Sequence, residues 1–186
     1  MNKTPDIERY RLFLIDQLPE PLSHASSHLQ IFDNYIPDTR IRLRKIRDPY
    51  SKAWTYWLQQ RTVAGNEQAS VKRIAEFHLN DAEYDFFRRY EHLEIRKNRY
   101  FHEFDLLVVA FDVYLGDLSG LTTARVDFRS DLELNNFEVP PFAVFEITSD
   151  PFFEGQNMIG KHYEEVKAEV DRLADGQPRS AETSDE

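Results

Sequence analysis

Charged and apolar side chains alternate along parts of this chain with a period of two residues. In the most regular stretch, Arg40, Arg42 and Arg44 fall on one face of an extended chain, and Ile41 and Leu43 fall on the other. Three guanidinium groups on one strand face repel one another unless anions lie among them. The pattern therefore predicts β-strands that have one charged face and a place for anions beside it.

Nine segments are rich in Ile, Val, Phe, Tyr, Trp and Thr, which is typical of strands. They lie near 6–15, 28–36, 39–47, 53–63, 69–79, 93–102, 105–115, 122–129 and 142–149. Apolar residues at helical spacing predict one helix from Asn80 to about Glu91 and another from about Gln156 to Ala174. We expect a mainly β protein of the α+β class, with antiparallel strands and a helix packed at the C-terminal end.

A charged strand face has a common explanation, which is an open antiparallel sheet with one side in water. At least four strands of this chain carry such a block, however, with the patterns Arg-x-Arg-x-Arg, Glu-x-His, Lys-x-Arg and Arg-x-Asp. That repetition favours a closed barrel of eight to nine strands whose charged faces point inward. Because side chains nearly fill the interior of such a barrel, these charges must pair, bind a metal or hold an ion.

The composition describes one ordinary domain and limits its partners. The 186 residues carry 33 Asp and Glu against 23 Lys and Arg, a formal net charge of −10, which argues against duplex nucleic acid and anionic membranes. Cysteine is absent, so disulfides and thiolate chemistry are excluded. No apolar stretch suits a membrane span or a signal peptide, and we expect a cytoplasmic protein. We expect residues 1–174 to form the domain and 175–186 a disordered acidic tail.

Acids and arginines that converge inside one barrel suit a small polyphosphate with bound divalent cations. Guanidinium groups bind phosphate oxygens in pairs, and carboxylates bind Mg²⁺ or Mn²⁺ ions that bridge to the same oxygens. A ligand of this size enters a barrel, whereas duplex nucleic acid does not. The acidic excess would then lie largely in helices, loops and the tail, away from the barrel interior.

Several short charged motifs follow one another along the chain. Residues 6–10 read Asp-Ile-Glu-Arg-Tyr, and residues 40–42 read Arg-Ile-Arg. Further on, 97–100 read Lys-Asn-Arg-Tyr, 111–114 read Phe-Asp-Val-Tyr and 145–150 read Phe-Glu-Ile-Thr-Ser-Asp. Together, and in this order, they resemble the motifs of the CYTH superfamily, the triphosphate tunnel metalloenzymes that include class IV adenylate cyclases and thiamine triphosphatases. The resemblance implies a closed β-tunnel with peripheral helices and a C-terminal helix that plugs one mouth.

The resemblance also implies a metal-dependent triphosphatase that uses Mg²⁺ or Mn²⁺ and acts on an inorganic or an organic triphosphate. In this interpretation, Glu8 and Glu146 activate the attacking water. The phosphates are bound by Arg40, Arg42, Arg44, Arg61, Lys97, Arg99 and Arg125. The divalent cations are bound by Asp6, Glu8, Glu76, His78, Asp127 and Glu146.

Departures from the family pattern leave other functions open. Tyr10 stands where the family has a lysine, and His78 and Arg125 stand where it has acids. Fewer carboxylates weaken metal binding, whereas triphosphate binding can persist. The main alternative is a tunnel that binds a phosphorylated ligand or polyphosphate without turning it over. An adenylate cyclase is less favoured because the sequence identifies no base pocket. Asp112 either orients an arginine or binds metal, and the oligomeric state, including a homodimer, is left open.

Overall fold

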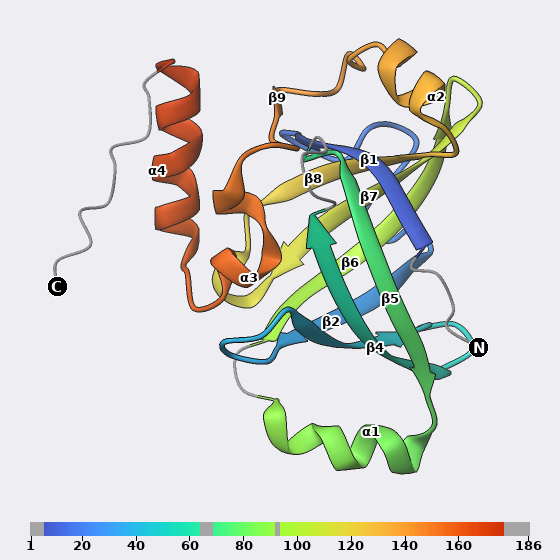
Figure 1. Cartoon of the computed structure of the whole chain (residues 1–186). Helices are drawn as coiled ribbons and strands as arrows, with labels where there is room; N and C mark the ends of the chain where they lie inside the picture. Colours follow the sequence, from blue (N-terminus) through green and yellow to red (C-terminus); the bar gives the residue numbers. More distant parts are fainter. Residues whose placement is uncertain (1–5, 64–68, 92–93, 177–186) are drawn as a thin grey trace, which may run out of the picture.

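The strands close into a barrel, with one further strand added at its edge (Figure 1). The computed structural model describes residues 6–63, 69–91 and 94–176. Most of the predicted acidic tail, residues 177–186, lies outside this part of the chain. The strands are β1 (Asp6–Leu14), β2 (His28–Tyr35), β3 (Ile41–Arg47), β4 (Trp54–Val63), β5 (Val71–Leu79), β6 (Glu94–Phe104), β7 (Leu107–Leu115), β8 (Thr122–Phe128) and β9 (Phe145–Glu146).

Antiparallel pairing links these strands in the order β5-β4-β3-β2-β6-β7-β8-β1-β9, and a further pairing of β1 with β5 closes the ring of eight. One edge of β1 pairs with β8 along residues 9–14. The other edge pairs with β5 along residues 6–9 and with β9 at residues 13–14. The predicted fold class, a mainly β protein built on a closed antiparallel barrel, is confirmed.

The charged strand faces point into the barrel and the apolar faces point outward, as the alternation predicts. On β8, Arg125 and Asp127 line the interior. The alternate residue Val126 is buried on the outside, in a cluster with Phe13 of β1 and Leu134 of α2 (Asp131–Asn136). Much of the hydrophobic core therefore packs on the outer face of the barrel, around a polar interior.

The first predicted helix is present as α1 (Asp81–Phe87), which continues as a short 3-10 helix, η1 (Arg88–Tyr90). Its N-cap is Asn80, whose side chain accepts a hydrogen bond from the Glu83 N–H, while the Glu83 carboxylate accepts one from the Asn80 N–H. Tyr84 of this helix packs against the outer face of the barrel. No helix in the described part of the chain is both long and apolar enough to cross a membrane.

The predicted helix over 156–174 is two helices, α3 (Gly155–Met158) and α4 (Tyr163–Ala174). Gly160 separates them with a φ of 73°, a conformation that favours glycine. One end of the tunnel is closed by Phe153 of the 3-10 helix η3 (Pro151–Phe153) and by Met158 of α3. Among the described residues, none from α4 lines the tunnel, and α4 packs Val166 against this closing segment instead (Figure 1). Of the predicted C-terminal helix, the first part, α3, therefore lines the tunnel, and the longer part, α4, packs behind it.

Candidate functional site

The barrel encloses a cavity of about 570 Å³, which the inward strand faces and residues 147–158 line. Its lining carries eight basic and six acidic side chains, a net charge of +2, whereas the whole chain carries −10. The basic residues are Arg40, Arg42, Arg44, Arg61, Lys72, Lys97, Arg99 and Arg125, and the acidic residues are Glu8, Asp33, Asp112, Asp127, Asp150 and Glu154. All the cations that the sequence analysis assigns to phosphate binding therefore lie around one cavity.

Asp112 on β7 holds two basic residues of β6. The register places Arg99 opposite Asp112, and Arg99 donates from Nε and Nη2 to the two carboxylate oxygens at 2.6 and 2.7 Å. Lys97 Nζ lies 2.7 Å from Asp112 Oδ2. Burial alone would raise the pKa of Asp112, but Arg99 and Lys97 outweigh it and hold that pKa well below its usual range. Burial also lowers the pKa of Lys97, to about 8, against the opposing attraction of Asp112. Asp112 thus orients basic side chains, one of the two roles that the sequence leaves open.

Asp33 on β2 holds two arginines of β3 in the same way. Arg44 donates from Nε and Nη2 at 2.6 and 2.7 Å, and Arg42 Nη1 lies 3.4 Å from Asp33 Oδ2. Arg42 also donates from Nε to Gln59 Oε1 at 3.0 Å. Burial opposes ionisation of Asp33, but Arg42 and Arg44 hold its pKa well below the usual range. Asp33 is not among the predicted site residues, although a carboxylate within the largely apolar segment 28–36 indicates that a cation faces it inside the protein.

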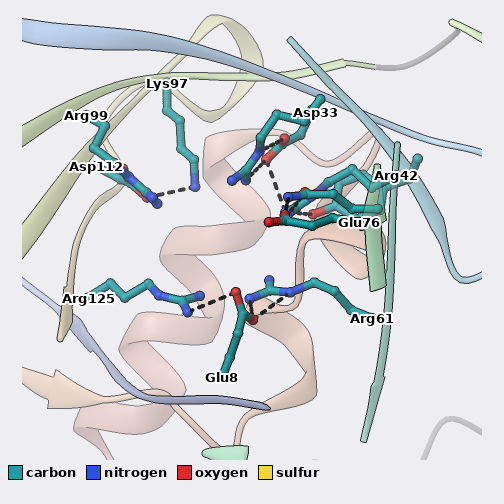
Figure 2. Close-up of polar contacts among 12 residues, drawn as sticks. Glu8, Asp33, Arg42, Arg61, Glu76, Lys97, Arg99, Asp112 and Arg125 are labelled. Atoms are coloured by element: carbon teal, nitrogen blue, oxygen red, sulfur yellow. Dashed lines mark hydrogen bonds and ion pairs between the residues drawn. The ribbon is translucent and has the colours of Figure 1, made fainter. Parts of the chain in front are cut away.

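Glu8 on β1 lies between Arg61 of β4 and Arg125 of β8, apart from the two pairs described above (Figure 2). Arg61 donates to Glu8 Oε2 from Nη2 and, at 3.0 Å, from Nε. Arg125 Nη2 lies 3.6 Å from Glu8 Oε1 and also donates to Asp127 Oδ1 at 2.5 Å. Burial alone would raise the pKa of Glu8, but Arg125 and Arg61 lower it to about 2. Glu8 is therefore ionised at neutral pH and is a weak base.

Tyr10 lies among three cations next to Glu8. The guanidinium carbon of Arg125 is 4.2 Å from the centre of the Tyr10 ring, and Arg61 and Lys72 are each 5.9 Å from it. The ring is 6% exposed, so these contacts lie in a site with little water. Lys72, which is not among the predicted site residues, forms an ion pair with Glu154, with Lys72 Nζ 2.7 Å from Glu154 Oε1.

Arg40 lies between the tunnel and a second, more open pocket of about 600 Å³ and lines both. Residues from 35–40 and 156–159 form this second pocket. Each of the other seven lining cations has an ion pair with a carboxylate. Within the described residues, the exposed Arg40 guanidinium has none, so it is available to an anion that enters from this side.

The acids that the sequence analysis assigns to divalent cations are not gathered in one place. Glu8 and Asp127 line the cavity, whereas Asp6, Glu76, His78 and Glu146 do not. Glu146 lies opposite Phe13 in the register, on the outward face of β1, and binds Arg11 at 2.5 Å. Glu76 accepts a hydrogen bond from Gln59 at 2.7 Å. In the described ranges, no three or more His, Asp and Glu side chains form a group that could hold a metal ion.

The two acids that do reach the cavity are also engaged. Both oxygens of Glu8 face guanidinium groups, and Asp127 shares Arg125 with Glu8. In phosphate sites Mg²⁺ is typically held by one or two carboxylates together with substrate phosphates and water. Among the described residues, neither carboxylate that reaches the cavity is free for this role, so the donor set does not fit the divalent metal site that the resemblance implies.

Comparison with solved structures identifies the fold. No protein-family model matches the chain, and no curated protein matches it. The crystal structure of the hypothetical protein NE1496 aligns with a TM-score of 0.56 and 20% identity, over 83% of this chain and 99% of that chain. A crystal structure of the inorganic triphosphatase NE1496 aligns with a TM-score of 0.55 and 20% identity, over 82% and 93% of the two chains. The chain therefore has the fold of NE1496.

Proposed function

We propose that this protein hydrolyses a small triphosphate that binds inside the barrel. The observation that carries the proposal is the convergence of eight basic side chains on one cavity of about 570 Å³ in a chain of net charge −10. A cavity of this size is in the range of small-molecule sites, and its walls exclude duplex nucleic acid. The fold shared with the inorganic triphosphatase NE1496 supports the same proposal.

The buried ion pairs prepare the tunnel for phosphate groups. Arg44 and Arg99 are each fixed by two hydrogen bonds to a buried carboxylate, so little side-chain freedom is lost when a ligand binds. Arginine and lysine bind phosphate oxygens through charge-assisted hydrogen bonds, which are stronger in a partly dry cavity than in water. The net positive charge of the lining would attract the negative charge of a triphosphate.

Hydrolysis of a phosphoric anhydride depends mainly on positioning and on charge neutralisation. The oxygen of a bound water forms the new bond to the terminal phosphorus, the bridging P–O bond breaks, and the proton of the water passes to the phosphate products. We assign to Glu8 the orientation of this water, because a carboxylate of pKa about 2 accepts a hydrogen bond well but removes a proton poorly. Glu146 has no part in this step, since it faces away from the cavity.

The test is release of phosphate from inorganic triphosphate and, separately, from ATP. Each reaction is run with Mg²⁺, with Mn²⁺ and with EDTA, because the proposal contains no step that depends on a metal ion. Arg42→Ala should slow hydrolysis by about 100-fold, which is typical for the loss of one charge-stabilising donor. Arg73→Ala is the matched control, because Arg73 is exposed on β5 outside the cavity. Wild-type rates equal to the blank under all three conditions would refute the hydrolase proposal.

A binding protein without turnover is the second candidate, and one observation favours it. Every lining carboxylate discussed above is paired with a cation, so no basic carboxylate is free to activate water. This candidate predicts that the melting temperature rises progressively as the triphosphate concentration increases and that no phosphate is released. Phosphate release above the blank would exclude it.

A further inference from the structure

The Glu8 end of the tunnel has the composition of an anion site, because the Glu8 carboxylate lies between two guanidinium groups as a bound anion would. Arg61 and Arg125 approach Glu8 from opposite sides (Figure 2). The pKa of Arg61 is lowered by burial and by the positive charges of Arg42 and Arg125, although Glu8 opposes this change. The guanidinium groups of Arg42, Arg61 and Arg125 therefore repel one another despite the carboxylates of Glu8 and Asp127, and a further anion would relieve this repulsion.

Tyr10 holds the two guanidinium groups at this place. Its ring lies within 4.2 Å of Arg125 and 5.9 Å of Arg61, measured from the ring centre to the guanidinium carbons. Cations are attracted to the face of an aromatic ring, and the attraction is larger where water is excluded. The two arginines thus keep their contact with the uncharged Tyr10 ring when a ligand draws them away from Glu8.

A phosphate group and a divalent cation would interact differently with the arginines of this site. A cation would have to displace guanidinium groups from Glu8 and would gain no second free carboxylate, because Asp127 is bound by Arg125. A phosphate oxygen would instead add a partner to Arg61 and Arg125, whose donors already point into the cavity. The electrostatics of the described side chains thus favour the anion.

We propose that Arg61 and Arg125, supported on the ring of Tyr10, bind a phosphate group of the ligand directly, at the place where the fold resemblance implies a divalent metal. The proposal rests on the proposed function in one respect, which is that the ligand is a triphosphate. Arg61 and Arg125 are binding residues, and Tyr10 is a positioning residue that acts through them. Glu8 then competes with the ligand for the two guanidinium groups while it orients the water.

The deciding measurement is calorimetric binding of inorganic triphosphate to the full chain, once in EDTA and once in Mg²⁺. We expect binding in EDTA, and no more than about threefold tighter binding in Mg²⁺, a difference below about 0.7 kcal/mol. In EDTA, Glu8→Gln should tighten binding by about threefold or more, because the competing carboxylate is gone. Arg125→Gln should weaken it by about tenfold. A metal site predicts the opposite for Glu8→Gln, namely loss of binding together with its metal dependence, and that result would overturn the proposal.

Tyr10 is tested by two substitutions. Tyr10→Phe keeps the ring and should keep the affinity, whereas Tyr10→Leu should weaken triphosphate binding about three- to tenfold in EDTA. Equal loss in both variants would refute the role of the ring. Melting temperatures and circular dichroism establish that each variant is folded. If Glu8→Gln does not fold, the comparison of wild-type binding in EDTA and in Mg²⁺, together with the affinity of Arg125→Gln, still tests the proposal.

The failure of this proposal and the failure of the proposed function give different results. Binding in EDTA without phosphate release refutes the hydrolase and supports the direct contact. Binding only in Mg²⁺ refutes the direct contact and leaves the hydrolase standing. No binding of triphosphate in either buffer refutes both.

Discussion

Two kinds of acid line the same tunnel, and they differ in how completely they are enclosed. Asp33 and Asp112 have side chains that are 3% exposed, and each is held by two basic residues of the neighbouring strand. Glu8 has a side chain that is 24% exposed, and its partners come from β4 and β8. The chemistry of the pairs is the same, so the difference lies in access to water and ligand. We infer that the buried pairs support the wall of the tunnel and that the Glu8 pairs are the ones that a ligand rearranges.

The largest effect should come from removing a buried acid. Asp112→Asn leaves Lys97 and Arg99 without their counter-charge at a place where the side chain of residue 112 is only 3% exposed. Breaking a buried pair in this way typically costs about 3–5 kcal/mol, and we expect a loss of that size in the free energy of unfolding, measured with urea. Glu8→Gln should cost about 1–2 kcal/mol, because water can solvate the arginines that it leaves. Equal losses in the two variants would show that the tunnel acids do not fall into two classes.

A smaller effect should appear in acid. The folded state lowers the pKa of Glu8 from 4.5 to about 2, so ionised Glu8 stabilises the fold above about pH 4.5, and this contribution is lost as the pH falls toward 2. Glu8→Gln lacks the group, and its free energy of unfolding should fall by about 1 kcal/mol less than that of the wild type between about pH 4.5 and 3. Urea unfolding at a series of pH values measures the difference. If the free energy of unfolding changes with pH in the same way in the two proteins, the lowered pKa of Glu8 and its stabilisation by Arg61 and Arg125 would be contradicted.

The sequence predicts the strands and their inward faces because both depend on a local period of two residues. It does not predict which acid meets which cation, because that depends on strand order and on register. Asp33 meets Arg44 only because β2 and β3 pair with these residues opposite each other. Lys72 enters the site only because β5 closes the barrel against β1, which places it opposite Glu8.

The predicted metal ligand Glu146 also shows that a sequence motif does not determine where its side chain points. Glu146 belongs to a motif that resembles the family pattern, yet β9 is two residues long and pairs with β1 at the edge of the barrel. Its side chain therefore shares the outward side of β1 with Arg11 rather than the tunnel. Residue type in a motif predicts chemistry only when the strand that carries it also turns the side chain inward.

The smallest expected effect concerns ligand binding at alkaline pH and tests whether a buried pair also serves the ligand. Burial lowers the pKa of Lys97 to about 8. A folded-state pKa below the usual value of 10.5 means that the unfolded chain binds more protons between these values, so this group makes the fold more stable as pH rises from about 8 to 10.5. Triphosphate binding should change in the opposite direction, because a neutral Lys97 no longer attracts phosphate.

We therefore expect the wild-type affinity for inorganic triphosphate to fall about three- to tenfold between about pH 7.5 and 9 relative to Lys97→Arg, since a guanidinium stays charged over this range. Calorimetry in EDTA at each pH gives the two dissociation constants, and their ratio removes the ionisation of the triphosphate itself, which both proteins share. A constant ratio would mean that Lys97 only neutralises Asp112 and that the buried ion pairs support the tunnel wall without binding the ligand. If the ratio of the wild-type dissociation constant to that of Lys97→Arg rises with a midpoint near pH 8, Lys97 binds phosphate although it is buried. The buried acids would then differ in role from Glu8, whereas the buried cations would bind the ligand as Arg61 and Arg125 do.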